Sequence, residues 1–351
     1  MTDPKRVLIV LPNWLGDIVM ALPSVAAARN HFASQHLAVA LPRAMTPVVR
    51  MLTGLDAVVS LEGGQDGFAS DVATLAGRKY DIAVLFPNSF RSAWMTYRAG
   101  IMERWGYAAD FRRLLLTRAV KRPREGGHHS NYYRRLLGKL KISIEDDNAK
   151  LVVTDSQRAR AARLLERHRV ASSRPIVVMA PGSAHGHAKQ WLPERYAEVA
   201  RRSVIELGQS VVFVGGIDDR PVGRAIESFI TEAGHGLSDE RQIVNLIGHT
   251  DLTELIGILA NCEACVSNDT GAMHLAAVLS KPVVAVFGPS DERVTAPIGP
   301  HELLSHPVRC RPCLLRDCPI DHRCMTGIST NDVFSALVRC LNSNETKEAS
   351  S

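Results

Sequence analysis

Two successive series of short apolar runs, each run followed by a segment of helical character, constrain the fold of this chain most strongly. Nearly continuous apolar runs are typical of strands that are buried on both faces of a parallel sheet. Strands that alternate with helices predict helices on both sides of that sheet. The first series comprises Val7–Leu11, Leu37–Leu41, Ala57–Ser60 and Asp81–Phe86, and the second comprises Ile176–Ala180, Val211–Val214, Ile243–Leu246, Cys262–Val266 and Val283–Phe287. The sequence therefore predicts an α/β protein built from two doubly wound Rossmann-like domains.

The boundary between the two series is expected near residue 170. The charged helical segment Asp155–Arg169 ends at Ala171–Pro175, which has few apolar residues and is suited to act as a hinge. We therefore expect a first domain over residues 1–170 and a second over 171–341, followed by a polar, disordered tail over 342–351. Because ligands of open α/β sheets bind beyond the carboxyl ends of the strands, we expect the binding site in a central cleft between the two domains.

Composition argues against a membrane-spanning or secreted protein. Apolar residues make up 46% of the chain and charged residues 22%, and no run approaches the ~20 apolar residues that cross a bilayer. The first residues, Met1–Arg6, lead directly into an apolar run that ends without a signal-peptide cleavage site. Seven cysteines, an odd number, fit reduced thiols better than a disulfide framework. We expect a cytoplasmic protein.

The net charge of +6 is concentrated between Arg91 and Arg135. The basic residues there are Arg91, Arg98, Arg104, Arg112, Arg113, Arg118, Lys121, Arg122, Arg124, Arg134 and Arg135, against the acids Glu103, Asp110 and Glu125. Three partners fit such a stretch, namely a nucleic acid, an anionic membrane surface or a phosphorylated substrate, and for any single residue a solvated basic face is the commoner role. Aromatic residues make up only 5% of the chain and no nucleic-acid motif is present. The sequence thus favours anionic lipid or a phosphorylated glycan over nucleic acid.

The segment Ser267–His274 joins a predicted strand to a predicted helix. Asp269 and Thr270 can cap that helix, Gly271 lets a ligand approach the backbone, and the unpaired N–H groups at the helix start suit an anion, above all a diphosphate. His274 lies about one turn further on and faces the same end. The alternative is an ordinary capped helix.

A second loop, Ala180–Pro193, follows the first strand of the second half. Gly182 and Ser183 offer backbone N–H and hydroxyl donors to phosphate oxygens, and Lys189 is a cation that can neutralise a leaving diphosphate. The alternative, a flexible surface loop, is weakened by the anchor at Trp191 and its neighbours.

A third close-approach site is expected at Gly215 and Gly216, after Val211–Val214. Asp218 or Asp219, just beyond, can bond ribose hydroxyls. An ordinary tight turn explains the double glycine equally well.

In the first half, the loop Pro12–Asp17 follows the first strand and leads into a helix. It has one glycine where a dinucleotide fingerprint needs three. Its Asp17 carboxylate can instead act as a general base toward a hydroxyl. The commoner role for such an aspartate is to cap the helix.

Cys310, Cys313, Cys318 and Cys324 are close in the sequence. Four such thiols can bind zinc or an iron–sulfur cluster. No standard zinc spacing is matched, so structural thiols in a proline-containing loop are favoured over a metal site. Whether they bind metal is left open by the sequence.

Several of these segments, taken in order, resemble one family. They are Pro12-Asn13-Trp14-Leu15-Gly16-Asp17, Phe86–Ala93, Ala180-Pro181-Gly182-Ser183 with Lys189-Gln190-Trp191 and Pro193, and Ser267-Asn268-Asp269-Thr270-Gly271 with His274. The chain resembles the ADP-heptose:lipopolysaccharide heptosyltransferases, most of all the heptosyltransferase II group, from Val7 to about Leu341. The Cys310–Cys324 loop is like that of some members, whereas the insertion His185-Gly186-His187 departs from the usual pattern.

The resemblance implies a GT-B fold, inverting glycosyl transfer, and no cofactor or required metal. It implies ADP-L-glycero-D-manno-heptose as donor and the first heptose of the Kdo–lipid A inner core as acceptor, at the inner face of the cytoplasmic membrane. Asp17 is then the catalytic base and Lys189 stabilises the leaving group. The expected donor-binding residues are Gly182, Ser183, Lys189, Gly215, Asp269, Thr270, Gly271 and His274, and the expected acceptor-binding residues are Asn13, Asn88, Arg91, Arg112 and Arg113.

Three other functions stay open at this point, the weakest of which is a metal-binding interaction module built on the Cys310–Cys324 loop. A transferase with the same donor and a different glycan or protein acceptor would share the loops of the second domain. A catalytically silent nucleotide-sugar binding protein would keep those loops without a base, and the presence of Asp17 argues for an enzyme.

Overall fold

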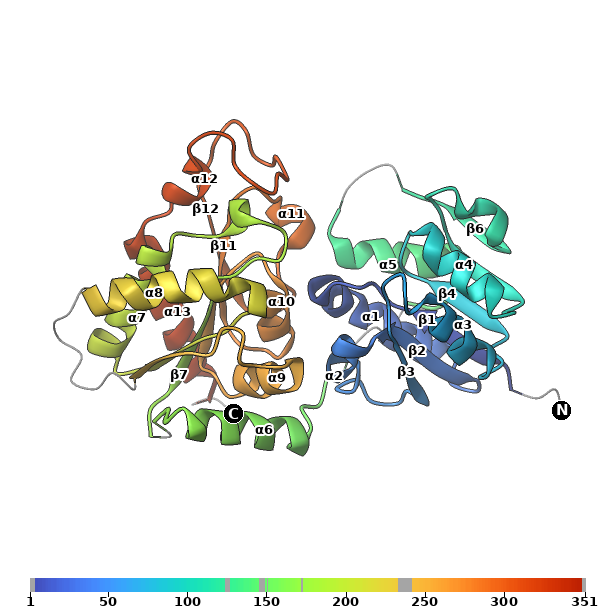
Figure 1. The fold of residues 1–351 in the computed structure, drawn as a ribbon, viewed down its shortest axis with the longest axis horizontal. Coiled ribbons are helices and arrows are strands. Elements are labelled where there is room, and N and C mark those ends of the chain that lie inside the picture. Colours follow the sequence, from blue (N-terminus) through green and yellow to red (C-terminus); the bar gives the residue numbers. More distant parts are fainter. Residues whose placement is uncertain are drawn as a thin grey trace. The chain divides into compact units, whose positions relative to one another are not determined.

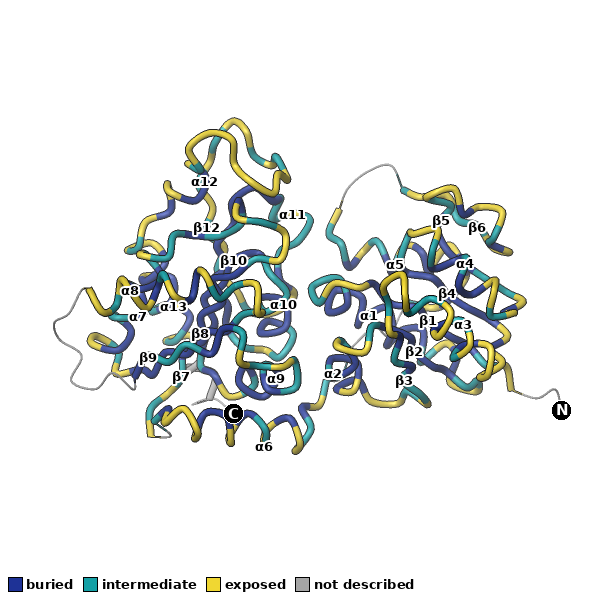
Figure 2. The backbone as a smooth tube through the Cα atoms, in the orientation of Figure 1, coloured by how far each residue is buried: buried dark blue, intermediate teal, exposed yellow. Residues whose placement is uncertain are grey.

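The computed structural model describes residues 4–123, 127–144, 149, 151–171, 173–232 and 242–348. The chain divides into two compact units, Met1–Val152 and Val153–Ser351, each built around one parallel sheet (Figure 1). In each unit the buried residues are concentrated in the strands and the inward faces of the helices (Figure 2). The prediction of an α/β fold with two doubly wound sheets is confirmed.

The first sheet has the strand order β3-β2-β1-β4-β5-β6. Its strands are β1 (Arg6–Val10), β2 (His36–Pro42), β3 (Ala57–Leu61), β4 (Ile82–Leu85), β5 (Glu103–Ala108) and β6 (Arg118–Lys121). Val7 pairs with Leu37 on one side and with Ile82 on the other, so β2 and β4 lie on opposite sides of β1. The strand order therefore reverses between β1 and β4, which is the switch point of this sheet. Strands β5 and β6 were not predicted, because their charged residues hide the apolar pattern.

Helices lie on both faces of this sheet. They are α1 (Leu15–His31), α2 (Thr46–Val49), α3 (Phe68–Ala76), α4 (Phe90–Arg98) and α5 (His129–Lys139), with short 3₁₀ turns η1 (Arg43–Met45) and η2 (Arg112–Leu115). Leu8 and Val10 join a buried cluster with Leu75 of α3 and Met95 of α4. Side chains alternate along a strand, so the intervening residues face the other side, where α1 packs beside α5.

The second sheet has the order β12-β11-β10-β7-β8-β9. Its strands are β7 (Ile176–Ala180), β8 (Ser210–Phe213), β9 (Ile243–Asn245), β10 (Ala264–Asn268), β11 (Val283–Phe287) and β12 (His301–Ser305). Its helices are α6 (Asp155–Arg167), α7 (Pro193–Leu207), α8 (Arg220–Glu232), α9 (Leu252–Ala260), α10 (Gly271–Val278), α11 (Glu292–Thr295), α12 (Arg323–Thr326) and α13 (Thr330–Glu348), with 3₁₀ turns η3 (His187–Lys189) and η4 (Ile217–Asp219). The direction of growth reverses between β7 and β10.

The division between the units falls before α6 rather than near residue 170. Helix α6 packs on α9, where a Cβ at Gly257 would lie only 2.3 Å from the Gln157 carbonyl oxygen. Arg160 of α6 also pairs with Asp251 at 2.8 Å and Glu254 at 3.2 Å. The many charges of α6 conceal the narrow apolar stripe that fixes it to the second unit.

The predicted disordered tail is wrong over most of its length. Helix α13 continues to Glu348, well past the expected start of the tail at Asn342. The polar residues there include Glu and Lys, which are good helix formers and extend a helix whose earlier turns are already buried. Residues 349–351 lie outside the described part of the chain.

Candidate active site

Asn268, at the end of β10, connects the loops that follow β7 and β10 at the switch point of the second sheet. Its Oδ1 accepts hydrogen bonds from the Trp191 N–H at 3.2 Å and the Tyr196 hydroxyl at 3.0 Å. Its Nδ2 donates to the carbonyl oxygens of Pro181 at 2.6 Å and Gly182 at 3.3 Å. This fully buried amide had no predicted role, and it sets the spacing of the two expected phosphate loops.

Lys189, Asp269 and His274 form a buried polar cluster beside this amide, built on the Lys189–Asp269 ion pair. Lys189 Nζ lies 2.6 Å from Asp269 Oδ2, with side chains 16% and 5% exposed. His274 Nε2 lies 3.9 Å from the other carboxylate oxygen, and the Thr295 hydroxyl lies 3.4 Å from Oδ2. The structure thus brings together three residues expected to serve one ligand and adds Thr295, which was not predicted.

Helix α10 begins at Gly271 without a side-chain cap. Its N-cap residue is Thr270, whose side chain makes no capping hydrogen bond. The expectation that Asp269 and Thr270 cap the helix is wrong, because Asp269 is paired with Lys189 and the Thr270 hydroxyl lies 3.1 Å from that of Ser267. The N-cap side chain therefore leaves the N–H groups of the first turn available to an anion.

Asp219 occupies backbone donors that were expected to meet a phosphate. Its Oδ1 accepts a hydrogen bond from the Ser183 N–H at 3.0 Å, and its Oδ2 accepts one from the Gly216 N–H at 2.9 Å. Asp219 was suggested as a ligand of ribose hydroxyls. In the structure its carboxylate instead links the loop at Ser183 to the loop at Gly216. The Ser183 hydroxyl is buried and has no hydrogen-bond partner among the described residues, so it remains a donor for a ligand.

Two of the predicted glycines face the Asp219 carboxylate. A Cβ at Gly182 would lie 2.1 Å from Asp219 Cγ, and one at Gly215 would lie 3.0 Å from Asp219 Oδ2. Any side chain at Gly182 would displace the carboxylate or the loop. The sequence analysis expected a ligand to lie close to the backbone at these glycines. Part of that space is instead filled by the Asp219 carboxylate.

In the first unit, Asp17 lies in the first turn of α1, after the strand β1. The N-cap position belongs to Trp14, which makes no side-chain capping bond. Asp17 Oδ1 instead lies 3.6 Å from Nδ1 of His129, the first residue of α5, and the two side chains are 27% and 33% exposed. The His129 ring stacks on Tyr133 at 5.5 Å, which holds the imidazole beside the carboxylate.

Helix α5 also reaches the loop after β4. The Tyr132 hydroxyl donates to Oδ1 of Asn88 at 3.0 Å, and the Tyr132 ring lies 5.9 Å from that of His129. Asp17 and Asn88 thus both meet α5, since β1 and β4 are neighbouring parallel strands. Asn13 is exposed. The roles of His129 and Tyr132 were missed, because no motif marks residues that meet their partners only through the fold.

Arg112 corrects one expectation of an acceptor-binding arginine. Its side chain is fully buried and donates to the Tyr107 carbonyl at 3.0 Å, to the Ser92 hydroxyl at 2.9 Å and to the carbonyl oxygen of Pro87. Burial lowers the pKa of Arg112 to about 10. An arginine in a basic stretch is expected on the surface, whereas this one is the internal anchor of η2.

The other predicted arginines differ in exposure. Arg91 pairs with the buried Asp71 at 3.5 Å and lies over the Phe68 ring, so much of its guanidinium serves α3–α4 packing. Arg113 is exposed. Arg124 lies outside the described residues.

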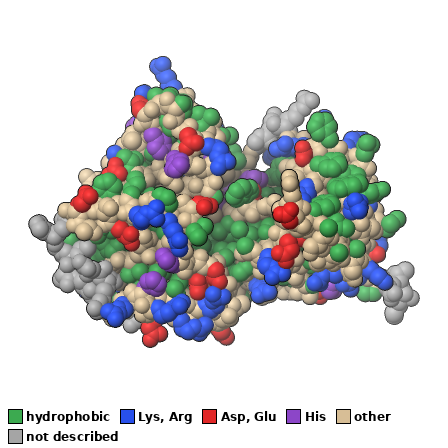
Figure 3. Space-filling view, in the orientation of Figure 1, with side chains coloured by type: hydrophobic (Ala, Val, Ile, Leu, Met, Phe, Trp, Pro, Cys, Tyr) green, Lys and Arg blue, Asp and Glu red, His purple; other side chains and the backbone are tan. Residues whose placement is uncertain are grey.

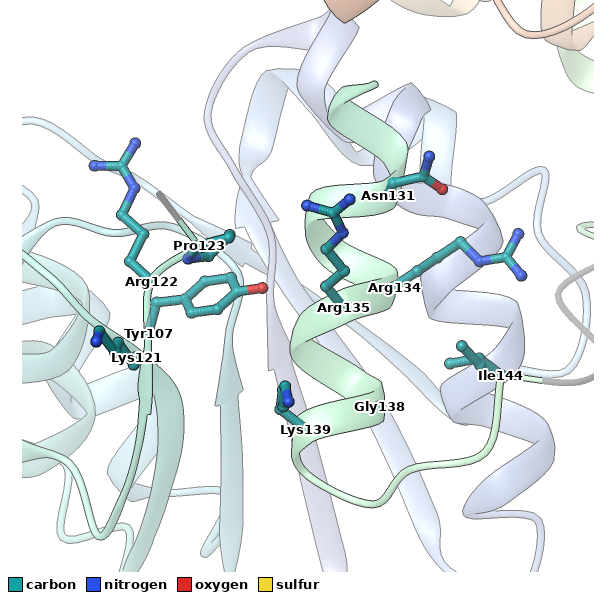
Figure 4. A pocket seen from close by; sticks show the side chains of 10 residues that line it. All are labelled: Tyr107, Lys121, Arg122, Pro123, Asn131, Arg134, Arg135, Gly138, Lys139 and Ile144. Atoms are coloured by element: carbon teal, nitrogen blue, oxygen red, sulfur yellow. The ribbon is translucent and has the colours of Figure 1, made fainter. Parts of the chain in front are cut away.

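A basic pocket of about 920 Å³ lies between the end of β6 and helix α5 in the first unit. Arg122 extends from the strand side, and Arg135 and Lys139 extend from α5 (Figure 4). No carboxylate is found among the described residues that line it, which are Tyr107, Lys121, Arg122, Pro123, Asn131, Arg134, Arg135, Gly138, Lys139 and Ile144. The pocket therefore suits a ligand with several negative charges.

The four cysteines of the loop converge. Cys310, Cys313, Cys318 and Cys324 line one small pocket, and burial raises the pKa of the Cys324 thiol. Within the described ranges, no group of three or more His, Cys, Asp or Glu side chains is arranged to hold a metal ion.

The inserted His185-Gly186-His187 packs on this cysteine-containing loop. His187 Nδ1 lies 3.0 Å from Asp317, and the Ala188 N–H donates to the Arg316 carbonyl. The insertion therefore braces η3, which carries Lys189.

Across the described residues, every helix is too short or too polar to cross a lipid bilayer.

Two parallel six-stranded sheets with flanking helices define a fold of GT-B type. Residues 72–323 match glycosyltransferase family 9 (heptosyltransferase), and the chain belongs to this family. It is 27% identical over 304 residues to lipooligosaccharide heptosyltransferase 2 of Haemophilus influenzae, covering 84% of this chain and 86% of that protein. It is 27% identical over 308 residues to lipopolysaccharide heptosyltransferase 2 of Escherichia coli K12, covering 84% and 85%.

The fold is also similar to a solved structure, that of E. coli ADP-heptose LPS heptosyltransferase II. The TM-score is 0.81 at 24% identity, over 97% of this chain and 99% of that one. The prediction of a glycosyltransferase of the heptosyltransferase family is therefore confirmed.

Proposed function

We propose that this enzyme transfers L-glycero-D-manno-heptose from ADP-heptose to the first heptose of the Kdo–lipid A inner core of lipopolysaccharide. The names of its relatives, lipooligosaccharide and lipopolysaccharide heptosyltransferase 2, support heptose transfer to this glycolipid, and the E. coli ADP-heptose LPS heptosyltransferase II of similar fold supports the donor. The observation that carries the proposal is the buried Lys189–Asp269 pair, at 2.6 Å, beside the start of α10. A fixed cation next to free helix N–H groups is what a nucleoside diphosphate needs.

Donor binding is assigned to the second unit. Lys189 and the N–H groups at Thr270 and Gly271 would meet the diphosphate, and the Ser183 hydroxyl would donate to one of its oxygens. Asp269 orients Lys189 and takes part in holding the loop or a donor hydroxyl, while His274 supports the phosphates. Gly215, whose Cβ position lies against Asp219, would line the nucleotide site beside β8 through its backbone.

Acceptor binding is assigned to the first unit. The five cations of the basic pocket, Lys121, Arg122, Arg134, Arg135 and Lys139, fit the phosphates and carboxylates of Kdo–lipid A. Asn13 and Asn88 are suited to bond sugar hydroxyls near Asp17, and exposed Arg113 adds positive charge. The enzyme would work at the inner face of the cytoplasmic membrane as a peripheral protein.

In the reaction, Asp17 removes the proton of an acceptor hydroxyl while that oxygen attacks the anomeric carbon of the donor. ADP leaves from the opposite face, so the configuration at that carbon inverts. His129 keeps the Asp17 carboxylate in place. Negative charge grows on the leaving diphosphate, and Lys189 with the N–H groups of α10 stabilises it. A positive charge supplied by lysine removes the need for a metal ion.

The test is a transfer reaction with purified protein, ADP-heptose and Kdo–lipid A that carries one heptose. We expect release of ADP and a mass gain of one heptose on the acceptor. Kdo–lipid A without the first heptose is the matched control and should give no product. Transfer to a different glycan or to a protein would favour the same donor with another acceptor, and ADP-heptose binding without turnover on any acceptor would favour a silent binding protein.

A further inference from the structure

The 3₁₀ turn η2 and its N-cap residue, Phe111, present two large apolar side chains to solvent. Phe111 is 96% exposed and Leu114 is 95% exposed, with the exposed Arg113 between them. Side chains of this size rarely remain so open in a soluble domain without a partner. Scattered single apolar residues need no explanation, but two that project from one turn mark a surface patch.

The backbone at this turn is strained. Asp110 has a φ of 48° and Phe111 a φ of 56°, both in the left-handed region that glycine favours. An aromatic residue is held there only where its surroundings determine the conformation. The conformation turns the Phe111 ring outward, where it makes no use of the interior of its own unit.

Beneath the turn, Arg112 and Asp110 fix the backbone. The buried Arg112 side chain binds the Tyr107 carbonyl and the Ser92 hydroxyl, and the Asp110 carboxylate accepts a hydrogen bond from the Phe90 N–H at 2.8 Å. The turn is thereby tied to the start of α4. The exposed residues are held on a braced platform rather than at the tip of a free loop.

Helix α4 continues the same surface with alternating aromatic and cationic groups. Phe90, Trp94 and Tyr97 stack in succession, with ring centroids 6.3 and 5.4 Å apart. Arg98 lies over the Trp94 ring at 5.6 Å, and Arg104 lies over the Tyr97 ring at 5.3 Å. Hydrophobic side chains gather over the part of the first unit that carries α4 (Figure 3).

We propose that η2 and α4 form a docking surface for an anionic phospholipid bilayer. Apolar and aromatic groups would enter the headgroup region, while the exposed Arg98 and Arg113 meet lipid phosphates. Arg104 braces this surface from within, because its guanidinium donates to the carbonyl oxygens of Leu115 and Met102. Charge complementarity favours an anionic bilayer: Arg98 and Arg113 are exposed, and the Glu103 carboxylate is paired with Lys5 at 3.4 Å. The inference rests on the proposed function in one respect: the benefit of binding a bilayer is that the proposed acceptor is a lipid.

The test measures binding of the full chain to vesicles without donor or acceptor. Vesicles of phosphatidylethanolamine with phosphatidylglycerol are compared with vesicles of phosphatidylcholine by co-sedimentation. We expect binding to the anionic vesicles, weakened by salt, and a loss on the order of tenfold or more in Phe111→Ser/Leu114→Ser, because both apolar side chains lose their buried area. The matched control, Ile205→Ser/Phe229→Ser, removes exposed apolar groups from α7 and α8 and should bind as the wild type does.

Phe111→Gly separates docking from folding. Glycine relieves the positive φ, so the thermal midpoint should stay the same or rise while vesicle binding falls. Wild-type binding by Phe111→Gly and by the double serine variant, equal binding to phosphatidylcholine, or dimerisation through this surface without vesicle binding would each overturn the proposal. Transfer to a water-soluble, deacylated acceptor should be unchanged in these variants. If the wild type and all variants fail to transfer heptose, that result would count against the proposed function and not against the docking surface.

Discussion

Lys189 Nζ lies 2.6 Å from Asp269 Oδ2, and neither side chain is more than 16% exposed. A buried ion pair is costly to break, because the remaining charge loses its partner away from water. The ammonium group has three N–H donors, so the bond to Asp269 leaves others for an incoming anion. The pair therefore holds one positive charge in position before any ligand arrives.

Lys189→Ala should lower kcat by about 10²–10³-fold and weaken ADP-heptose binding as well. The cation meets the diphosphate in the bound state and again as charge develops on it. Steady-state kinetics together with calorimetric titration of ADP measures both effects. Lys189→Arg keeps the charge and should recover part of each, whereas normal donor binding in Lys189→Ala would remove lysine from the donor site.

Chelation should leave the wild-type enzyme active, since Lys189 supplies the positive charge at the leaving group. The measurement is ADP release in EDTA compared with release in Mg²⁺. Activity that disappears in EDTA and returns with Mg²⁺ would show that the leaving group needs a metal.

Asp17→Asn should reduce kcat by about 10²–10⁴-fold, because the amide has the size of the carboxylate but cannot accept the acceptor proton. Affinity for ADP-heptose should be nearly unchanged, since Asp17 belongs to the other unit. Turnover at constant saturating donor tests this. Near-normal turnover would exclude Asp17 as the base.

Arg112→Met should destabilise the protein by about 2–4 kcal/mol, because several buried oxygen acceptors lose a charged donor. Arg113→Met, one residue along and exposed, should change the free energy of unfolding by less than about 0.5 kcal/mol. Urea unfolding of the two variants gives the comparison. Equal stability would mean that Arg112 is not the anchor of η2.

Arg122→Glu/Arg135→Glu should raise the KM for the acceptor and leave that for ADP-heptose nearly unchanged. Both cations line the basic pocket of the first unit. The effect should shrink with added salt, which screens exposed charges over about 8–10 Å. Arg224→Glu on α8, exposed and in the other unit, is the matched control. A selective loss of donor affinity in the double variant would instead connect the pocket with the nucleotide.

Strands buried on both faces were predictable because their apolar runs are continuous, as in Val7–Val10 and Val283–Phe287. Strand β12 was not predicted, since its residues are only partly buried or exposed. The strand orders, which were not predicted, place Asp17 after β1, Lys189 after β7 and Asp269 after β10, at the switch points of the two sheets.

Contacts between residues distant in sequence were beyond the reach of motifs. Nothing near His129 indicates that it meets Asp17, and the charge of Arg112 suggests the surface rather than the interior. Asp218 or Asp219 was predicted to bond ribose hydroxyls, whereas Asp219 accepts a hydrogen bond from the Ser183 N–H. In a sequence, a carboxylate that bonds its own backbone cannot be told from one that bonds a sugar.

Asn268 makes four hydrogen bonds, two through its oxygen and two through its nitrogen, which saturates the amide. Its orientation is consequently unique, since a rotated amide would set donor against donor. Two loops that are remote in the chain are thus obliged to move as one body. To change the enzyme's preference to another nucleotide sugar, the side chains around Asn268 can be substituted. Asn268 itself must be kept, because it holds the two loops together.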